Sequence, residues 1–84
     1  MEIKVLGTGC TKCKKLFAEA EEAARKSGQP VTVVKVEDLK DIVAFGVRQT
    51  PALVIDGKVR AAGRIPSAQE IGGWLTEAAR EGGK

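Results

Sequence analysis

The segment that decides the fold is Gly7-Thr8-Gly9-Cys10-Thr11-Lys12-Cys13, which directly follows the apolar run Ile3-Lys4-Val5-Leu6. A short apolar run that ends in Gly-Thr-Gly is typical of a β-strand followed by a tight loop. From Thr11 to Ser27 the apolar residues recur at steps of three and four, which predicts an amphipathic helix. Both cysteines therefore lie where the first strand ends and the first helix begins. The apolar stripe predicted for this helix is Cys13, Leu16, Phe17, Ala20 and Ala24.

The next segment predicts a second strand and a short helix. Residues 31–36 are mostly β-branched and almost continuously apolar, as in strands that are covered on both faces. Asp38 is a suitable N-cap for a short helix that Gly46 would close. A strand, a helix and a second strand form a βαβ unit, which is parallel and right-handed in nearly all cases. The apolar residues that the short helix is expected to turn inward are Leu39, Ile42, Val43 and Phe45.

The C-terminal half predicts a hairpin and a final helix. Two apolar segments, 52–55 and 58–62, flank Asp56-Gly57, a strong signal for a tight β-turn with positive φ angles. Ser67-Ala68-Gln69-Glu70 fits the spacing of a helix capping box. The expected order is β-α-β-α-β-β-α, an α/β fold with a parallel half and a hairpin half. We expect one domain over residues 1–84, because 84 residues suffice for one hydrophobic core and no second lobe.

Composition excludes several classes of function. The net charge is only +3, and the three aromatic residues all fall in helical patterns, so no nucleic-acid binding is expected. No apolar run approaches the roughly 18 residues of a membrane span, and the first residues do not resemble a secretory signal. A cytoplasmic monomer is the expectation. The absence of histidine rules out a Cys-His catalytic pair and any imidazole metal ligand.

The Cys10-x-x-Cys13 pair is the main candidate for chemistry. A thiolate is the nucleophilic form of cysteine, and a helix N-terminus favours an anion. Cys10 lies at that end near Lys12, whereas Cys13 lies one turn further along, on the apolar face. We therefore expect Cys10 to attack a disulfide and Cys13, more buried and harder to ionise, to resolve the intermediate. This chemistry needs no cofactor.

Two other interpretations of the pair stay open. Two thiolates on a loop can hold a soft metal such as Cu(I), as in small copper chaperones. Those proteins usually carry Met two residues before the first cysteine, where this chain has Thr8, and their hairpin directly follows the first helix. Alternatively, the domain is an interaction module whose cysteines do not turn over. A static disulfide across so short a loop would contribute little stability.

The segment Thr50-Pro51, before the predicted strand 52–55, is the second informative element. Proline is tolerated at the first position of a strand, where no hydrogen-bond donor is lost from the sheet. Only about 5–6% of X–Pro bonds in folded proteins are cis. Taken alone, the dipeptide therefore predicts a trans bond.

Together, Cys10-Thr11-Lys12-Cys13 after the first strand, Thr50-Pro51 before the third and Gly63 after the fourth resemble the thioredoxin/glutaredoxin superfamily. The resemblance is greatest to its short thioredoxin-like members, the small redox-active disulfide proteins, and covers nearly the whole chain. It implies a thioredoxin-like fold: a four-stranded mixed sheet with helices on both faces.

The resemblance also implies a function and a set of site residues. Pro51 would be cis and lie against the cysteine pair, and the Thr50 backbone would pair with an extended substrate segment. Gly63 would allow the substrate backbone to approach, and Thr11 and Lys12 would border it. The implied activity is that of a dithiol–disulfide oxidoreductase, with a protein disulfide as substrate and a reductase as electron donor.

Some features differ from the family pattern or lie outside it. Thr11-Lys12 is neither the Gly-Pro of thioredoxin nor the Pro-Tyr of glutaredoxin, and Lys4 stands where thioredoxins place a buried acid. The glutathione-binding segment of glutaredoxins has no match after Gly63. On the implied fold, Lys12, Arg48 and Arg64 would converge near the cysteines and favour an acidic partner.

Overall fold

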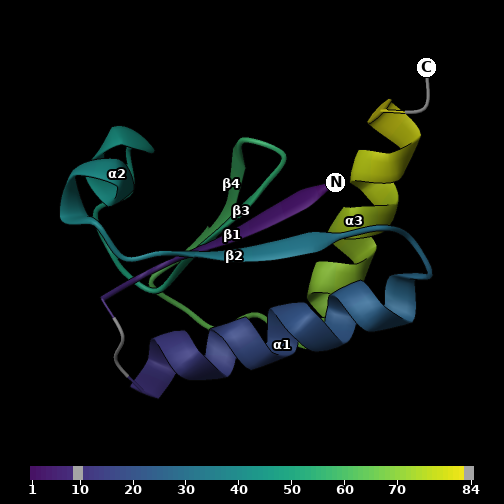
Figure 1. Ribbon diagram of the computed structural model, residues 1–84, viewed down its shortest axis with the longest axis horizontal. Helices are drawn as coiled ribbons and strands as arrows, with labels where there is room; N and C mark the ends of the chain where they lie inside the picture. The colour runs from purple at the N-terminus through teal and green to yellow at the C-terminus, as the bar shows by residue number, and fades with distance from the viewer. Residues whose placement is uncertain (9–10, 83–84) are drawn as a thin grey trace.

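The computed structural model describes residues 1–8 and 11–82 and contains one mixed sheet with three helices (Figure 1). The strand order is β2-β1-β3-β4. Strand β1 is parallel to β2 and antiparallel to β3, and β3 is antiparallel to β4. The predicted thioredoxin-like order is confirmed. The elements are β1 (Glu2–Leu6), α1 (Thr11–Ser27), β2 (Thr32–Val36), α2 (Leu39–Ala44), β3 (Ala52–Ile55), β4 (Lys58–Ala62) and α3 (Ala68–Gly82).

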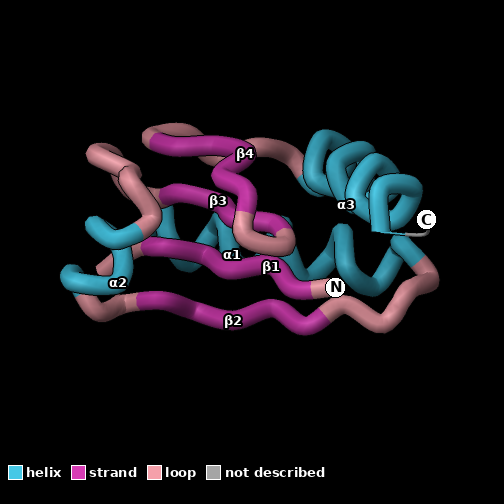
Figure 2. Tube along the Cα trace, turned by 90° about the horizontal axis from the view of Figure 1, so that it is seen from above, coloured by secondary structure: helices cyan, strands magenta, loops and turns pink. Residues whose placement is uncertain are grey.

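Helices cover both faces of the sheet, but unequally (Figures 1 and 2). Because side chains point alternately to the two faces of a strand, β1 and β3 each contribute side chains to two hydrophobic cores, one on each face of the sheet. Ile3 and Leu53 face α1 and α3 in the larger core. Leu6 and Val54 face α2 in the smaller core, around Ile42. Helix α2 spans only six residues, so its face of the sheet has the thinner cover.

The predicted turns and caps follow from local chemistry. Asp56 and Gly57 have φ angles of 47° and 85°, as a two-residue turn between β3 and β4 requires. The Asp38 side chain accepts a hydrogen bond from the Lys40 backbone N–H at 2.9 Å, which confirms Asp38 as the N-cap of α2. The cap thus defines where α2 begins.

Two expectations for the apolar residues of α2 are wrong. Leu39 and Val43 are 66% and 62% exposed, whereas Ile42 is buried and Phe45 half-buried against the smaller core. A helix of six residues has room to bury only one narrow stripe. Leu39 and Val43, four residues apart, lie next to each other on the exposed part of the α2 surface.

The second strand also differs from expectation. Its apolar run predicted a strand covered on both faces, but β2 lies at the edge of the sheet and its residues are exposed or half-buried. The fully buried strand is β3, which is flanked by β1 and β4. In α1 the fourth buried position is Ala23, while Ala24 is half-buried. Local apolar pattern alone does not specify a strand's place in the sheet.

Leu53→Ala and Leu39→Ala form a matched pair that tests this division of burial. Leu53 is fully buried, so its truncation should lower the free energy of unfolding by about 2–5 kcal/mol. Leu39→Ala, on the exposed side of α2, should change it by less than about 0.5 kcal/mol. Urea unfolding of both variants at neutral pH measures the difference. A large loss of unfolding free energy in Leu39→Ala would mean that the Leu39 side of α2 is packed against the protein.

Candidate functional site

The candidate site lies at one end of the sheet, where β1 leads into α1 and β3 begins (Figure 1). Cys13 is in the first turn of α1 and is 6% exposed. Thr11 and Lys12, the first two residues of the helix, are exposed. Cys10 lies outside the described residues. Of the predicted difference between the two cysteines, the structure therefore describes the Cys13 half: this cysteine is buried on the apolar face of α1.

Gly7 is the residue that lets Cys13 pack here. A Cβ added at Gly7 would collide with Cys13 Sγ and would lie 3.1 Å from Cys13 Cβ. Any other amino acid at position 7 would therefore displace the sulfur or the start of α1. Gly7 also continues the parallel pairing, since its N–H donates to the Val36 carbonyl at 3.0 Å. The close approach of backbone and sulfur fixes where the thiol lies relative to the sheet.

The strand register brings Pro51 to the same place. Leu6 pairs with Ala52 in the antiparallel β1–β3 ladder. Gly7 directly follows Leu6 and Pro51 directly precedes Ala52, so both residues lie at the same end of the sheet. Pro51 is buried and Thr50 is exposed. The Thr50–Pro51 bond is cis, the form that the family resemblance implies and that the dipeptide alone does not.

Gly63 is joined to Pro51 by a backbone hydrogen bond. The Gly63 N–H donates to the Pro51 carbonyl at 2.9 Å. Gly63 has a φ of 78°, and a Cβ there would collide with Gln49 Oε1. Both conditions favour glycine. Of the residues predicted from the sequence, Cys13, Pro51 and Gly63 are thus brought to one end of the sheet.

Lys4 does not place a charge beneath Cys13 on the α1 side of the sheet. Its Nζ lies 5.1 Å from the Phe45 ring centroid, in the α2 layer, and 3.6 Å from Glu2 Oε1. The neighbouring residue Val5 faces α1 and lines a pocket of about 140 Å³ beside Cys13. Lys35 and Glu37 also line this pocket. Sequence analysis missed them, because the end of β2 approaches α1 only in three dimensions.

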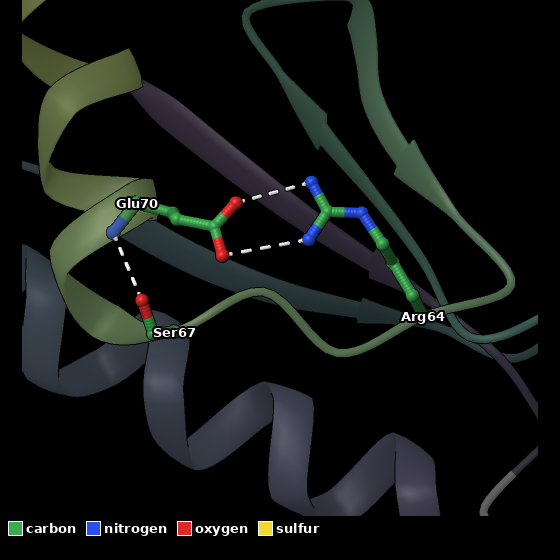
Figure 3. A network of polar contacts seen from close by, with 3 residues as sticks. All are labelled: Arg64, Ser67 and Glu70. Carbon is green, nitrogen blue, oxygen red and sulfur yellow. Dashed lines mark hydrogen bonds and ion pairs between the residues drawn. The ribbon is translucent and has the colours of Figure 1, made fainter.

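Arg64 is held by α3 and is not an unpaired cation beside the cysteines. Its guanidinium contacts the Glu70 carboxylate, with Nη2–Oε2 at 3.1 Å (Figure 3). The guanidinium carbon also lies 5.8 Å from the Trp74 ring centroid. The Glu70 backbone N–H donates to Ser67 Oγ at 3.2 Å, as the predicted capping box requires. The expected three-cation rim is therefore wrong in its Arg64 member. Lys12 and Arg48 remain exposed.

The described residues hold no group of three or more Cys, Asp or Glu side chains arranged for a metal ion. A site with two thiolates would need Cys10, which lies outside them. Within residues 1–8 and 11–82, no helix is both long and apolar enough to cross a lipid bilayer.

Gly7→Ala tests the contact between Gly7 and Cys13. The added methyl should lower the free energy of unfolding by about 1–3 kcal/mol, because it overpacks a filled space. In a double-mutant cycle with Cys13→Ala, the loss should be less than additive, since the sulfur that obstructs the methyl is gone. Gly73→Ala is the control: a Cβ there meets nothing within 4 Å, and alanine should stabilise α3 by up to about 1 kcal/mol. Strict additivity in the cycle would contradict the contact.

Glu70→Gln tests the Arg64–Glu70 pair through pH. The hydrogen bond from Arg64, followed by the Arg64 charge and the Ser67 backbone, lowers the pKa of Glu70 below its ordinary value of 4.5. The pair therefore stabilises the fold above pH 4.5, and this contribution is lost as the pH falls through the lowered pKa. Urea midpoints of wild type and Glu70→Gln should differ at pH 6 and converge toward pH 3. The exposed control Glu21→Gln should not show this convergence.

Comparison with known proteins agrees with the fold. Residues 1–76 match the family described as Thioredoxin domain. A protein named thioredoxin from Methanothermobacter thermautotrophicus is 34% identical over 71 residues, which cover 84% of this chain and 92% of that protein. A thioredoxin from Methanocaldococcus jannaschii is 35% identical over 69 residues, covering 82% and 79%. The chain therefore belongs to the thioredoxin family and is a small thioredoxin-like redox protein.

Proposed function

We propose that the protein is a dithiol–disulfide oxidoreductase that acts on protein disulfides through Cys10 and Cys13. The observation that carries the proposal is the packing of Cys13. Its thiol is buried in the first turn of α1, against Gly7 and at the level of Pro51. This position suits a thiol that meets its partner cysteine three residues earlier and is protected from outside reagents.

The reaction proceeds in two exchanges. The Cys10 thiolate attacks one sulfur of the substrate disulfide, forming a mixed disulfide and releasing the other substrate sulfur as a thiolate that takes up a proton. Cys13 then loses its proton and attacks Cys10 Sγ. A Cys10–Cys13 disulfide forms, and the second substrate sulfur leaves as a thiolate. Two electrons pass from the protein to the substrate, so a reductase must return the protein to the dithiol form.

The substrate segment would lie beside Thr50. Thr50 is exposed and precedes the buried Pro51, so its backbone can pair with an extended chain in the manner of an added strand. Gly63 lies next to Pro51, because its N–H donates a hydrogen bond to the Pro51 carbonyl. It has no side chain that would obstruct the substrate segment. Thr11 and Lys12, exposed at the start of α1, would border the same surface. We propose that the protein acts as a cytoplasmic monomer without a bound cofactor.

Lysine charges at the start of α1 support the role of Cys10 as the attacking thiol. Lys12, Lys14 and Lys15 are all exposed within the first five residues of the helix, and that turn holds no acidic residue. Positive charge near a helix N-terminus favours a thiolate over a thiol. The same charges would attract an acidic partner surface and raise its association rate.

Single cysteine variants separate the two roles. Cys13→Ser should accumulate a mixed disulfide with a substrate protein such as insulin, because nothing resolves the first exchange. Cys10→Ser should accumulate none, because the remaining thiol is buried. Non-reducing electrophoresis with mass spectrometry identifies the adducts. Wild type should lose two thiols on oxidation without dimerising, and dithiothreitol should restore both.

Other outcomes would favour the two alternative functions. Tight, stoichiometric Cu(I) binding with negligible insulin reduction would indicate a metal carrier. Cysteines that form neither an internal disulfide nor an adduct would indicate an interaction module. If Cys10→Ser, which retains Cys13, formed the mixed disulfide faster than Cys13→Ser, the two assigned roles would be reversed.

A further inference from the structure

The pocket beside Cys13 contains charged groups that the proposed exchange does not yet use. Its volume is about 140 Å³, and it lies between the start of α1 and the end of β2. Its charged residues are Lys14 from α1, Lys35 from β2 and Glu37 from the segment that follows β2, while Val5 of β1 and Gly7, just after β1, also line it. Among the described residues of this lining, Glu37 is the one that carries a carboxylate.

The second exchange requires a proton acceptor near Cys13. The nucleophile is the thiolate, and a thiol that is 6% exposed ionises less readily than one in water. Lys4, on the central strand β1, lies in the α2 layer and is a cation, so it cannot accept this proton. The pocket that Cys13 itself lines offers a route by which the proton can leave.

Glu37 is available for that role. It is exposed, and within the described part of the chain its carboxylate is engaged in no hydrogen bond or ion pair. Lys35 is directed elsewhere, since its Nζ lies 4.7 Å from the Phe17 ring centroid. The pocket volume greatly exceeds the roughly 10–15 Å³ that one water molecule needs, and the charged side chains of its lining can form hydrogen bonds with water. Water can thus connect the thiol to the carboxylate.

We infer that Glu37 accepts the proton of Cys13, through water in this pocket, during the second exchange. The inference rests on the proposed function. The Cys13 S–H bond breaks and its proton reaches the Glu37 carboxylate, while the sulfur keeps the electron pair and attacks Cys10 Sγ. The Cys10–substrate S–S bond breaks, and the substrate thiolate takes up a proton from solvent or from Glu37. Lys14, which lines the same pocket, stabilises the transient negative charge.

The role of Glu37 as acceptor can be separated from the effect of its charge. A nearby carboxylate also disfavours a thiolate by repulsion. If repulsion were its only effect, Glu37→Gln would speed the second exchange. If Glu37 accepts the proton, Glu37→Gln slows the second exchange, and the rate of that exchange then rises more steeply with hydroxide concentration. The two possibilities predict opposite signs.

Single-turnover kinetics of the full chain with a small protein disulfide provides the test. Acid quenching and alkylation separate mixed-disulfide formation from release of the reduced substrate. In Glu37→Gln, formation should keep the wild-type rate, and release at pH 6.5 should slow by about tenfold, less than the roughly 100-fold of a general base in direct contact. Glu37→Asp should restore part of the rate, and added imidazole or acetate should accelerate release in Glu37→Gln. Asp41→Asn, an exposed carboxylate on α2, is the matched control and should behave as wild type.

Each result has a distinct meaning. A release rate in Glu37→Gln that is unchanged or faster, with no response to added buffer, would overturn the role of Glu37 and leave the dithiol mechanism in place. If wild type forms no mixed disulfide, the proposed function fails before Glu37 is tested. Circular dichroism of each variant confirms that the fold is retained.

Discussion

The close contact between the Gly7 backbone and the Cys13 sulfur is the constraint on which the site depends. It brings the first turn of α1 against the end of β1, so the thiol sits at the level of the sheet. The same residue continues the pairing toward β2 and lies at the end of the sheet where Pro51 leads into β3. Three segments that are distant in sequence therefore meet at one backbone position without a side chain. A larger residue there would push the thiol away from both neighbouring strands.

The sheet makes this arrangement rigid. Both central strands, β1 and β3, are largely buried, and each packs one side against α1 and α3 and the other against α2. The larger core carries most of the apolar burial and holds α1 along its length. The smaller core, under the six residues of α2, holds only the end of the sheet where the site lies.

Charge around the site is divided by position. Lysines at the start of α1 are exposed to solvent, where they can act on an approaching partner. Arg64 forms an ion pair with Glu70 of α3 (Figure 3). It also lies near the Trp74 ring, so it secures the Gly63 segment to α3. The pocket beside Cys13 combines two lysines with the Glu37 carboxylate. Ion pairing decides which cations remain available to a partner.

The sequence by itself determined the local elements and the chemical class of the site. Helical periodicity, the Asp38 and Ser67 caps and the Asp56-Gly57 turn are interactions between near neighbours, so they could be predicted without a structure. Only the tertiary structure decided that β2 is an edge strand, that Leu39 and Val43 face solvent, that Arg64 pairs with Glu70 and that Glu37 comes beside Cys13. These features depend on which segments become neighbours when the sheet assembles. A local pattern of apolar and charged residues does not contain that information.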